Sequence, residues 1–249
     1  MKPDFLTDKL IRDYAKKVPT TPEDFEEPFM DYVIRHRLTL DSRYIKDKLS
    51  SHVEFLKKFP KSVTFFGSAR LTQASSHYDD ARRLASKIVT ELGYSVITGG
   101  GPGIMEAANL GAKEVNGNSI GLNIVIPHEQ HTNPHTNDNI TFDYFFTRKT
   151  MLNFAAEAYV FFPGGYGTFD ELFGVLTLIQ TKKIPAVPIV LFGKDFWNPL
   201  KDFLKKNMVD QHHTIDSDDL NLFVITDSVD TSIKIIKGAP VSTWWKIID

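Results

Sequence analysis

The sequence predicts an α/β protein with a Rossmann-like, doubly wound and mostly parallel sheet, preceded by a helical N-terminal extension. From residue 61 onward, short runs of β-forming residues alternate with longer helical patterns, which is typical of βαβ units. Several of these runs are continuously apolar, as strands are when helices cover both faces of a sheet. Glycine-rich turns leave the strands and lead into helices, at the edge where open α/β sheets bind ligands.

Composition narrows the class of protein. The chain has 249 residues, of which 42% are hydrophobic and 24% charged, enough for one large domain with an appendage. With 29 basic and 31 acidic residues, no global basic field favours nucleic acid or an anionic membrane as partner. The absence of cysteine excludes disulfides, thiolate metal sites and a cysteine nucleophile. No apolar run approaches the roughly 18 residues of a spanning helix, and no leader is evident. We therefore expect a cytoplasmic protein.

Residues 1–60 form the predicted extension, and residues 61–249 form the predicted α/β domain. Apolar side chains recur at helical spacing over 25–34 and 44–56. Thr21 followed by Pro22 indicates an N-cap with proline in the first turn of a helix. The extension carries no motif with evident chemistry, and we expect it to pack on the main domain or on a second subunit.

The elements of the α/β domain follow in order. Runs of β-branched and aromatic residues indicate the strands, and helical spacing indicates the helices. Gly93 ends the first of these helices at a position that favours a left-handed residue. Paired phenylalanines, including Phe145 and Phe146, are expected in the core. Predicted strands cover 63–66, 94–98, 120–126, 142–146, 158–162, 187–192 and 222–225; predicted helices cover 78–92, 104–115, 168–181 and 196–209, with a further helix opening at Arg148.

The central stretch of the domain runs from Arg148 to Glu171. It reads as a helix that opens on Arg148 and Lys149, a buried strand over 158–162, and a glycine turn that feeds a second helix. Glycines let backbone N–H groups approach an anion closely, and the following helix adds the positive end of its dipole. The stretch therefore predicts a phosphate-binding turn with a carboxylate just inside the helix.

Two glycine clusters, over 99–103 and 164–167, each follow a strand and precede a helix. One such turn could serve chain geometry alone, but two on one sheet edge favour binding. Neither is followed by Gly-Lys-Ser/Thr, and the turn after the first strand, which contains Gly67 and Ser68, lacks the dinucleotide fingerprint. A mononucleotide or sugar phosphate therefore fits better than a nicotinamide cofactor. Ser68 adds a hydroxyl donor to the same edge.

Two charged residues have alternative interpretations. Arg148 at a helix start is disfavoured by the dipole, so it either lies in a surface ion pair or projects into the anion site. Glu171 either forms a capping box with Thr168 or acts on a bound sugar phosphate. A carboxylate there would stabilise oxocarbenium character at the anomeric carbon and activate water. Asp170, about 100° away around the helix, is less suited to that role.

Three histidines lie in the loop after the third predicted strand, at 128, 131 and 135. Metal ligation is one interpretation of this spacing. The loop also holds two prolines, and no helix sets one face for its side chains, so we favour a flap over the pocket and expect no metal site.

The order and spacing of three motifs over residues 62–203 resemble the Lonely Guy (LOG) family of nucleoside 5′-monophosphate phosphoribohydrolases, long catalogued as possible lysine decarboxylases. The motifs are the glycine cluster leading to Met105 and Glu106, the Arg148-Lys149 pair, and Pro163-Gly-Gly-Tyr-Gly-Thr through Glu171. In place of the Met-His-x that precedes the arginine in the best-known cytokinin enzymes, this chain has Phe146-Thr147, which leaves the base open.

The resemblance implies a homodimer, or a higher homo-oligomer, that hydrolyses a nucleoside monophosphate to free base and ribose 5-phosphate without a cofactor. Arg148 and Glu171 take the positions of the family's two catalytic residues. The phosphate loop falls on Gly164, Gly165, Gly167 and Thr168. We expect the rest of the substrate site to comprise Ser68, Gly100, Gly101, Gly103, Met105 and Lys149.

Two other functions remain open. A carrier could keep the phosphate loop and perform no chemistry, although the presence of both Arg148 and Glu171 argues against this. A pyridoxal-phosphate decarboxylase would need a Schiff-base lysine with an acidic partner for the ring nitrogen. Lys149 is the only tempting lysine, and nothing in the sequence pairs it.

Overall fold

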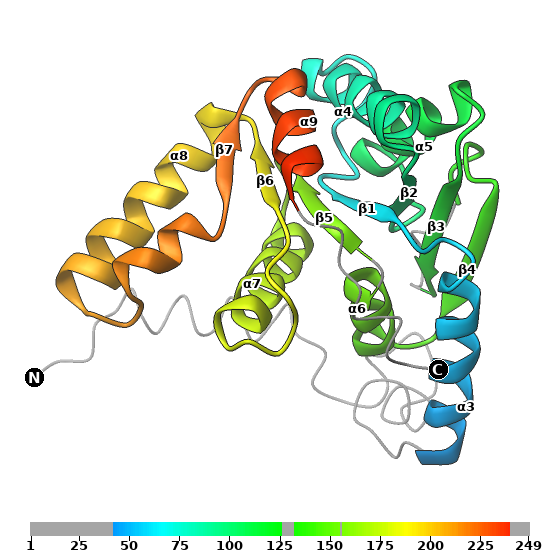
Figure 1. Ribbon diagram of the computed structural model, residues 1–249, viewed down its shortest axis with the longest axis horizontal. Helices are drawn as coiled ribbons and strands as arrows, with labels where there is room; N and C mark the ends of the chain where they lie inside the picture. The colour runs from blue at the N-terminus through cyan, green and yellow to red at the C-terminus, as the bar shows by residue number, and fades with distance from the viewer. Residues whose placement is uncertain (1–41, 126–131, 155, 240–249) are drawn as a thin grey trace, which may run out of the picture. The chain divides into compact units, whose positions relative to one another are not determined.

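The computed structural model describes residues 42–125, 132–154 and 156–239 (Figure 1). The chain divides into two compact units, Met1–Lys48 and Leu49–Asp249. The predicted helix over 25–34 and the N-cap at Thr21 lie outside the described residues. The helical pattern over 44–56 is confirmed, because helix α3 spans Ser42–Leu56. Leu56, at the end of α3 and within the second unit, is buried in the core.

The sheet has seven strands, and each hydrogen-bonded pair of neighbours is parallel. Their order is β4-β3-β2-β1-β5-β6-β7, which confirms the predicted doubly wound architecture. The five inner strands are buried along their whole length, as their continuous apolar character predicts. The strands are β1 (Ser62–Phe66), β2 (Ser95–Thr98), β3 (Ser119–Ile124), β4 (Asp138–Phe142), β5 (Ala156–Phe161), β6 (Ile189–Phe192) and β7 (Val224–Thr226).

Helices cover both faces of the sheet. Helices α4, α5 and α9 lie on one face, and α6 and α7 lie on the other (Figure 1). Alternate strand residues feed two separate cores: Phe65 belongs to the core under α4 and α5, whereas Phe66 belongs to the core with α6 and α7. The helices are α4 (Ser76–Lys87), α5 (Ile104–Glu114), α6 (Phe145–Phe154), α7 (Tyr166–Gln180), α8 (Lys194–Phe203) and α9 (Val229–Gly238).

Short helical segments extend two of these helices. The π-helical segment η2 (Ile88–Leu92) continues α4, and η3 (Leu204–Gln211) continues α8. Gly93 ends η2 with φ +67°, so the left-handed end predicted there is confirmed. A 3₁₀ segment, η4 (Ser217–Asn221), precedes β7. Helix α9 was not among the sequence predictions.

One predicted strand is wrong. Residues 142–146 were expected to be extended, but β4 ends at Phe142 and α6 begins at Phe145. The actual strand is an edge strand with mostly exposed side chains, so it has no apolar run to reveal it. Phe145 and Phe146 are 59% and 41% exposed, which also corrects their assignment to the core.

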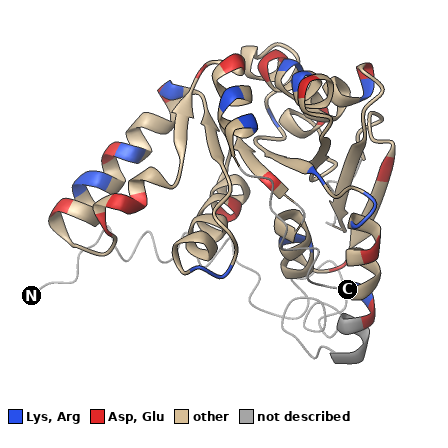
Figure 2. Cartoon of the chain, in the orientation of Figure 1, with Lys and Arg blue, Asp and Glu red and all other residues tan. Residues whose placement is uncertain are grey.

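Charges of both signs are interspersed over the described helices, notably along α4, α8 and α9 (Figure 2). Many of them form ion pairs within a helix or between neighbouring helices, such as Lys87 with Asp230 at 2.8 Å. Among the described residues, no helix is both long and apolar enough to cross a membrane.

Candidate active site

The candidate site lies at the carboxyl edge of the sheet, where the strand order reverses. From β1 the chain winds outward through β2, β3 and β4 on one side, and β5, β6 and β7 follow on the other. Such a reversal leaves a crevice between the two central strands, here β1 and β5. Their exit loops are tied together, because Ser68 N–H donates to the Pro163 carbonyl at 3.0 Å.

The loop after β5 leads directly into α7. The helix begins at Tyr166 with Gly165 as its N-cap, and no side chain caps it. Thr168 is 7% exposed, and its side chain fills the space that a side chain at Gly164 would need. The first N–H groups of a helix have no partner within the helix, so this end suits an anion.

Gly165 and Gly167 have no packing reason to be glycine. A methyl group built on either would meet nothing within 4 Å among the described residues, and neither has a positive φ. Glycine at these positions is therefore explained best by the close approach of a ligand to the backbone. Tyr166 between them is 97% exposed.

The glycines of the second loop have a different explanation. Gly103, with φ +70°, lies against the backbone of Ser68 and Ala69, and a side chain there would collide with both. Gly101 faces Met105, whose Cε would lie 2.8 Å from an added Cβ. Internal contacts thus account for this cluster, and its predicted contact with substrate remains a prediction.

A buried polar network that the sequence did not reveal fixes the second loop. Asn109 of α5 is fully buried and accepts from Thr98 Oγ1 at 2.6 Å and from Asn133 Nδ2 at 2.9 Å. Its own amide donates to Ser119 Oγ at 2.9 Å. Asn133 N–H in turn donates to the Gly100 carbonyl at 2.9 Å. The one feature of the sequence that could have indicated this network is an asparagine on the apolar face of a predicted helix.

Arg148 lies at the end of the first turn of α6 and reaches back to the sheet edge. Its Nε donates to the Leu122 carbonyl at 2.7 Å, and Nη2 donates to the Gly99 carbonyl at 3.2 Å. Burial lowers the pKa of the guanidinium, and the nearby Glu171 opposes that effect. These bonds hold the half-buried side chain at the sheet edge, and its predicted contact with an anion remains a prediction.

Glu171 lies in the second turn of α7, and the predicted capping box with Thr168 is not formed. Burial raises the pKa of its carboxyl to about 7, against the opposing effects of Lys149 and Arg148. Its Oε2 is buried and has no hydrogen-bond partner among the described residues. A carboxyl group with this pKa can accept or release a proton near neutral pH.

Lys149 faces α7. Its Nζ lies 2.8 Å from Asp170 Oδ1 and donates to the Asp170 carbonyl at 2.9 Å. The structure therefore brings Lys149 to the residue beside Glu171, whereas its predicted contact with phosphate remains a prediction. Asp170 is 69% exposed, which agrees with its lesser suitability for catalysis.

Ser68 and Met105 also lie at this edge. Ser68 Oγ accepts from Arg70 N–H at 3.0 Å, and within the described ranges its hydroxyl hydrogen is available to a ligand. Met105 Sδ lies 2.8 Å from the position of a Cβ built on Gly99. Asn123 of β3 lies against Gly100; it is 7% exposed, and its Nδ2 has no partner among the described residues. Sequence reasoning missed Asn123.

The histidine loop is only partly described. His128 and His131 lie outside the described residues, so the flap remains a prediction. His135 Nε2 lies 3.9 Å from Glu106 Oε1, and Glu106 also accepts from Tyr78 Oη at 3.2 Å.

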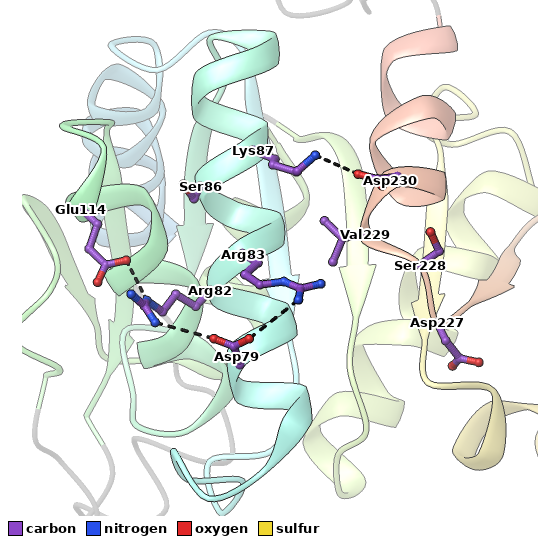
Figure 3. Close-up of a pocket in the computed structure, with 10 residues that line it drawn as sticks. All are labelled: Asp79, Arg82, Arg83, Ser86, Lys87, Glu114, Asp227, Ser228, Val229 and Asp230. Atoms are coloured by element: carbon purple, nitrogen blue, oxygen red, sulfur yellow. Dashed lines mark hydrogen bonds and ion pairs between the residues drawn. The ribbon is translucent and has the colours of Figure 1, made fainter.

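A groove of about 740 Å³ lies elsewhere, between α4 and α9 (Figure 3). Arg82 and Lys87 line it together with Asp227 and Asp230. Several of its charges are neutralised locally: Arg82 pairs with Glu114, and Lys87 pairs with Asp230 across the groove (Figure 3). It contains none of the glycine loops, so we place the candidate site at the sheet edge.

Comparison with protein families and curated proteins gives consistent matches. Residues 105–236 match the family described as possible lysine decarboxylase. The cytokinin riboside 5′-monophosphate phosphoribohydrolase LOG2 of Arabidopsis thaliana is 32% identical over 158 residues, which are 61% of this chain and 72% of that protein. The phosphoribohydrolase LOG of Oryza sativa is 29% identical over 59% of this chain and 61% of that protein.

Solved structures share the fold at lower identity. The molybdenum cofactor binding protein of Rippkaea orientalis has a TM-score of 0.52 and 20% identity, over 72% of this chain and 94% of that chain. The molybdenum cofactor carrier protein of Chlamydomonas reinhardtii has a TM-score of 0.52 and 22% identity, over 72% and 97%. At these identities the likeness establishes the Rossmann-like fold alone.

Proposed function

This chain belongs to the family described as possible lysine decarboxylase, and from that membership we propose that it is a nucleoside 5′-monophosphate phosphoribohydrolase. The reaction is hydrolysis of the N-glycosidic bond, which yields free base and ribose 5-phosphate. The curated relatives carry the name of this activity on cytokinin nucleotides. We propose an AMP-like or cytokinin riboside monophosphate as substrate.

The observation that carries the proposal is the proximity of Arg148 and Glu171 beside the loop that opens α7, where their chain neighbours Lys149 and Asp170 are in direct contact. Arg148 and Glu171 affect each other's pKa, so their charges lie close together. Hydrolysis of an N-glycoside builds positive charge on the ribose ring, which a carboxylate stabilises. An arginine beside that carboxylate can orient both the carboxylate and the substrate.

In the proposed mechanism, the phosphate binds at the N-terminus of α7, over Gly165, Gly167 and Thr168, with Ser68 as a further donor. Glu171 then accepts a proton from water as the water oxygen bonds to C1′ of the ribose. The N-glycosidic electron pair leaves with the base. The departing nitrogen is protonated by the proton that Glu171 has taken up, or by solvent, so one water is consumed. A pKa of about 7 suits a group that both accepts and returns a proton.

The test is chromatographic detection of free base and ribose 5-phosphate after incubation with AMP, GMP, CMP, UMP and isopentenyl-AMP. We expect release that falls by about 10²-fold or more in Glu171→Gln, the range for removal of a general base. Glu114→Gln, which alters an exposed carboxylate paired with Arg82, is the matched control and should retain activity. If Glu171→Gln kept more than about a tenth of the activity, the assigned role of Glu171 would be wrong.

The alternative function is a nucleotide-binding or carrier protein without chemistry. The structural neighbours named as molybdenum cofactor binding and carrier proteins give this alternative a precedent for the fold. Tight binding of AMP without base release over hours would favour it over the hydrolase.

The described residues give no positive support to a decarboxylase that uses pyridoxal phosphate. The lysine that the sequence singles out, Lys149, has its Nζ bonded to both the carboxylate and the carbonyl of Asp170. A Schiff base would require that both contacts be given up.

A further inference from the structure

A charged side chain links helices α6 and α7. Lys149 of α6 crosses to α7 and contacts Asp170 twice, once at the carboxylate and once at the main-chain carbonyl. The carbonyl belongs to the peptide unit that joins Asp170 to Glu171. A bond to this carbonyl therefore constrains the backbone from which the Glu171 side chain projects.

A glycine makes this crossing possible. A Cβ built on Gly174 would lie 2.7 Å from Lys149 Cε and 2.9 Å from Nζ. Gly174 is one helical turn after Asp170, so the two residues lie on the same face of α7. The stem of Lys149 passes over Gly174 on its way to Asp170, and any side chain at position 174 would displace it.

We propose that Lys149 is a positioning residue for the reaction: with Asp170 it holds α7 against α6 beside Glu171, and the two opposite charges of this pair act on the Glu171 carboxyl. This inference rests on the proposed function, because it assigns the Lys149–Asp170 pair a task at the proposed catalytic carboxylate. Lys149 then acts through Glu171 and not as a ligand of the phosphate.

The electrostatic surroundings of Glu171 support this role. Arg148 and Lys149 face it from α6, Asp170 from α7 itself, and Tyr159 from β5, whose phenol donates to the Asn153 carbonyl at 2.9 Å. After burial, Lys149 has the largest effect on the pKa of Glu171 and lowers it, whereas Asp170 raises it. The two members of one ion pair thus shift the pKa of the same carboxyl group in opposite directions.

This opposition gives a test that separates electrostatic tuning from simple loss of structure. Lys149→Met and Asp170→Asn both break the same ion pair, so a purely structural role predicts the same effect for both. Under the proposal, Lys149→Met raises the pKa of Glu171. Asp170→Asn lowers it, because the variant removes a negative charge and frees the positive charge of Lys149.

The first measurement is the pH dependence of kcat/KM for base release. We expect the acidic limb to move to higher pH in Lys149→Met and to lower pH in Asp170→Asn, each by about half a pH unit. This is below the 1–3 units of a close buried charge, because Lys149 is 28% exposed and water screens it. Lys87→Met, which breaks an exposed pair of the same 2.8 Å length with Asp230, should leave the limb in place.

The second measurement does not depend on turnover. The carboxyl carbons of glutamate are labelled with ¹³C, and the Glu171 signal is identified by its absence in Glu171→Gln. Its titration should shift upward in Lys149→Met and downward in Asp170→Asn. Shifts in the same direction, or none, would overturn the inference. Absence of base release from the wild-type protein would instead overturn the proposed function and leave this titration to decide on Lys149.

Discussion

The guanidinium of Arg148 occupies the space that a side chain on Gly99 would need, and its Nη2 donates to the Gly99 carbonyl at 3.2 Å. β2 ends at Thr98, one residue before this contact, while β3 continues to Ile124. Arg148 therefore bridges the two segments just beyond the point where the pairing of β2 with β3 stops. Its second hydrogen bond goes to the Leu122 carbonyl of β3.

We predict from this contact that Gly99→Ala lowers kcat/KM by about a hundredfold, the effect of an ångström-scale misplacement of a catalytic group. The added methyl group forces Arg148 away from the sheet edge. The matched control is Gly238→Ala, because a Cβ at Gly238 meets nothing within 4 Å in the part of the chain that the structure describes. Equal activity of the two variants would show that Arg148 need not lie against Gly99.

The raised pKa of Glu171 predicts how the free energy of unfolding depends on pH. A carboxyl whose pKa is about 7 in the folded protein and near 4.5 when unfolded lowers the stability of the fold as pH rises through that interval. Glu171→Gln should therefore match the wild type near pH 4. Above pH 7 it should be more stable, by about 1–3 kcal/mol after allowance for screening. Urea unfolding at pH 4 and pH 8 measures the difference. A constant difference at both values would contradict the raised pKa.

Asn109 should be a structural residue and not a substrate ligand. Asn109→Ala leaves the buried groups of Thr98, Ser119 and Asn133 short of partners, so we expect a loss of about 3 kcal/mol or more in the free energy of unfolding. Asn118→Ala, which removes one part-buried bond to Ser95 Oγ, should cost about 1 kcal/mol or less. Denaturant titration compares the two variants. Similar losses would mean that the network is not cooperative.

Asn123 should affect binding more than stability. Its Nδ2 is buried without a partner among the described residues, and a donor in that state costs the fold free energy. If substrate supplies the acceptor, Asn123→Ala raises KM by about 3–10-fold, the value of one hydrogen bond, while the unfolding free energy stays the same or rises. Steady-state kinetics and urea unfolding test both halves. A destabilised variant with unchanged KM would assign Asn123 to the fold alone.

We propose that α6 supplies a contact between two copies of the chain. Phe145 and Phe146 are adjacent, apolar and exposed, which is costly for a surface that stays in water. Replacing both by serine should shift sedimentation from dimer to monomer. Phe203→Ser is the control, since Phe203 is 56% exposed on α8. Dissociation by the control alone would move the interface to α8.

The sequence was sufficient for the α/β class and for the inner strands of the sheet. Continuous apolar runs identified the inner strands because both faces of a parallel sheet are buried. The position predicted for β4 was wrong. This edge strand is polar, whereas the exposed Phe145 and Phe146 that follow it form an apolar run typical of a strand. Sequence reasoning also missed Asn123, because a single polar residue in an apolar strand carries no periodic signal.

The sequence by itself determined the α/β fold, the two glycine loops and the candidacy of Arg148 and Glu171. These features depend on local periodicity and on glycines and charged residues at positions where a purely structural turn or helix does not require them. Tertiary structure alone decided what those residues contact. The tertiary structure brings Lys149 into contact with Asp170 and places Gly99 against Arg148. It also buries Glu171, which does not form the predicted capping box. Such contacts join residues as much as 49 positions apart along the chain, and local sequence patterns do not encode which distant residues the packing of helices on a sheet brings together.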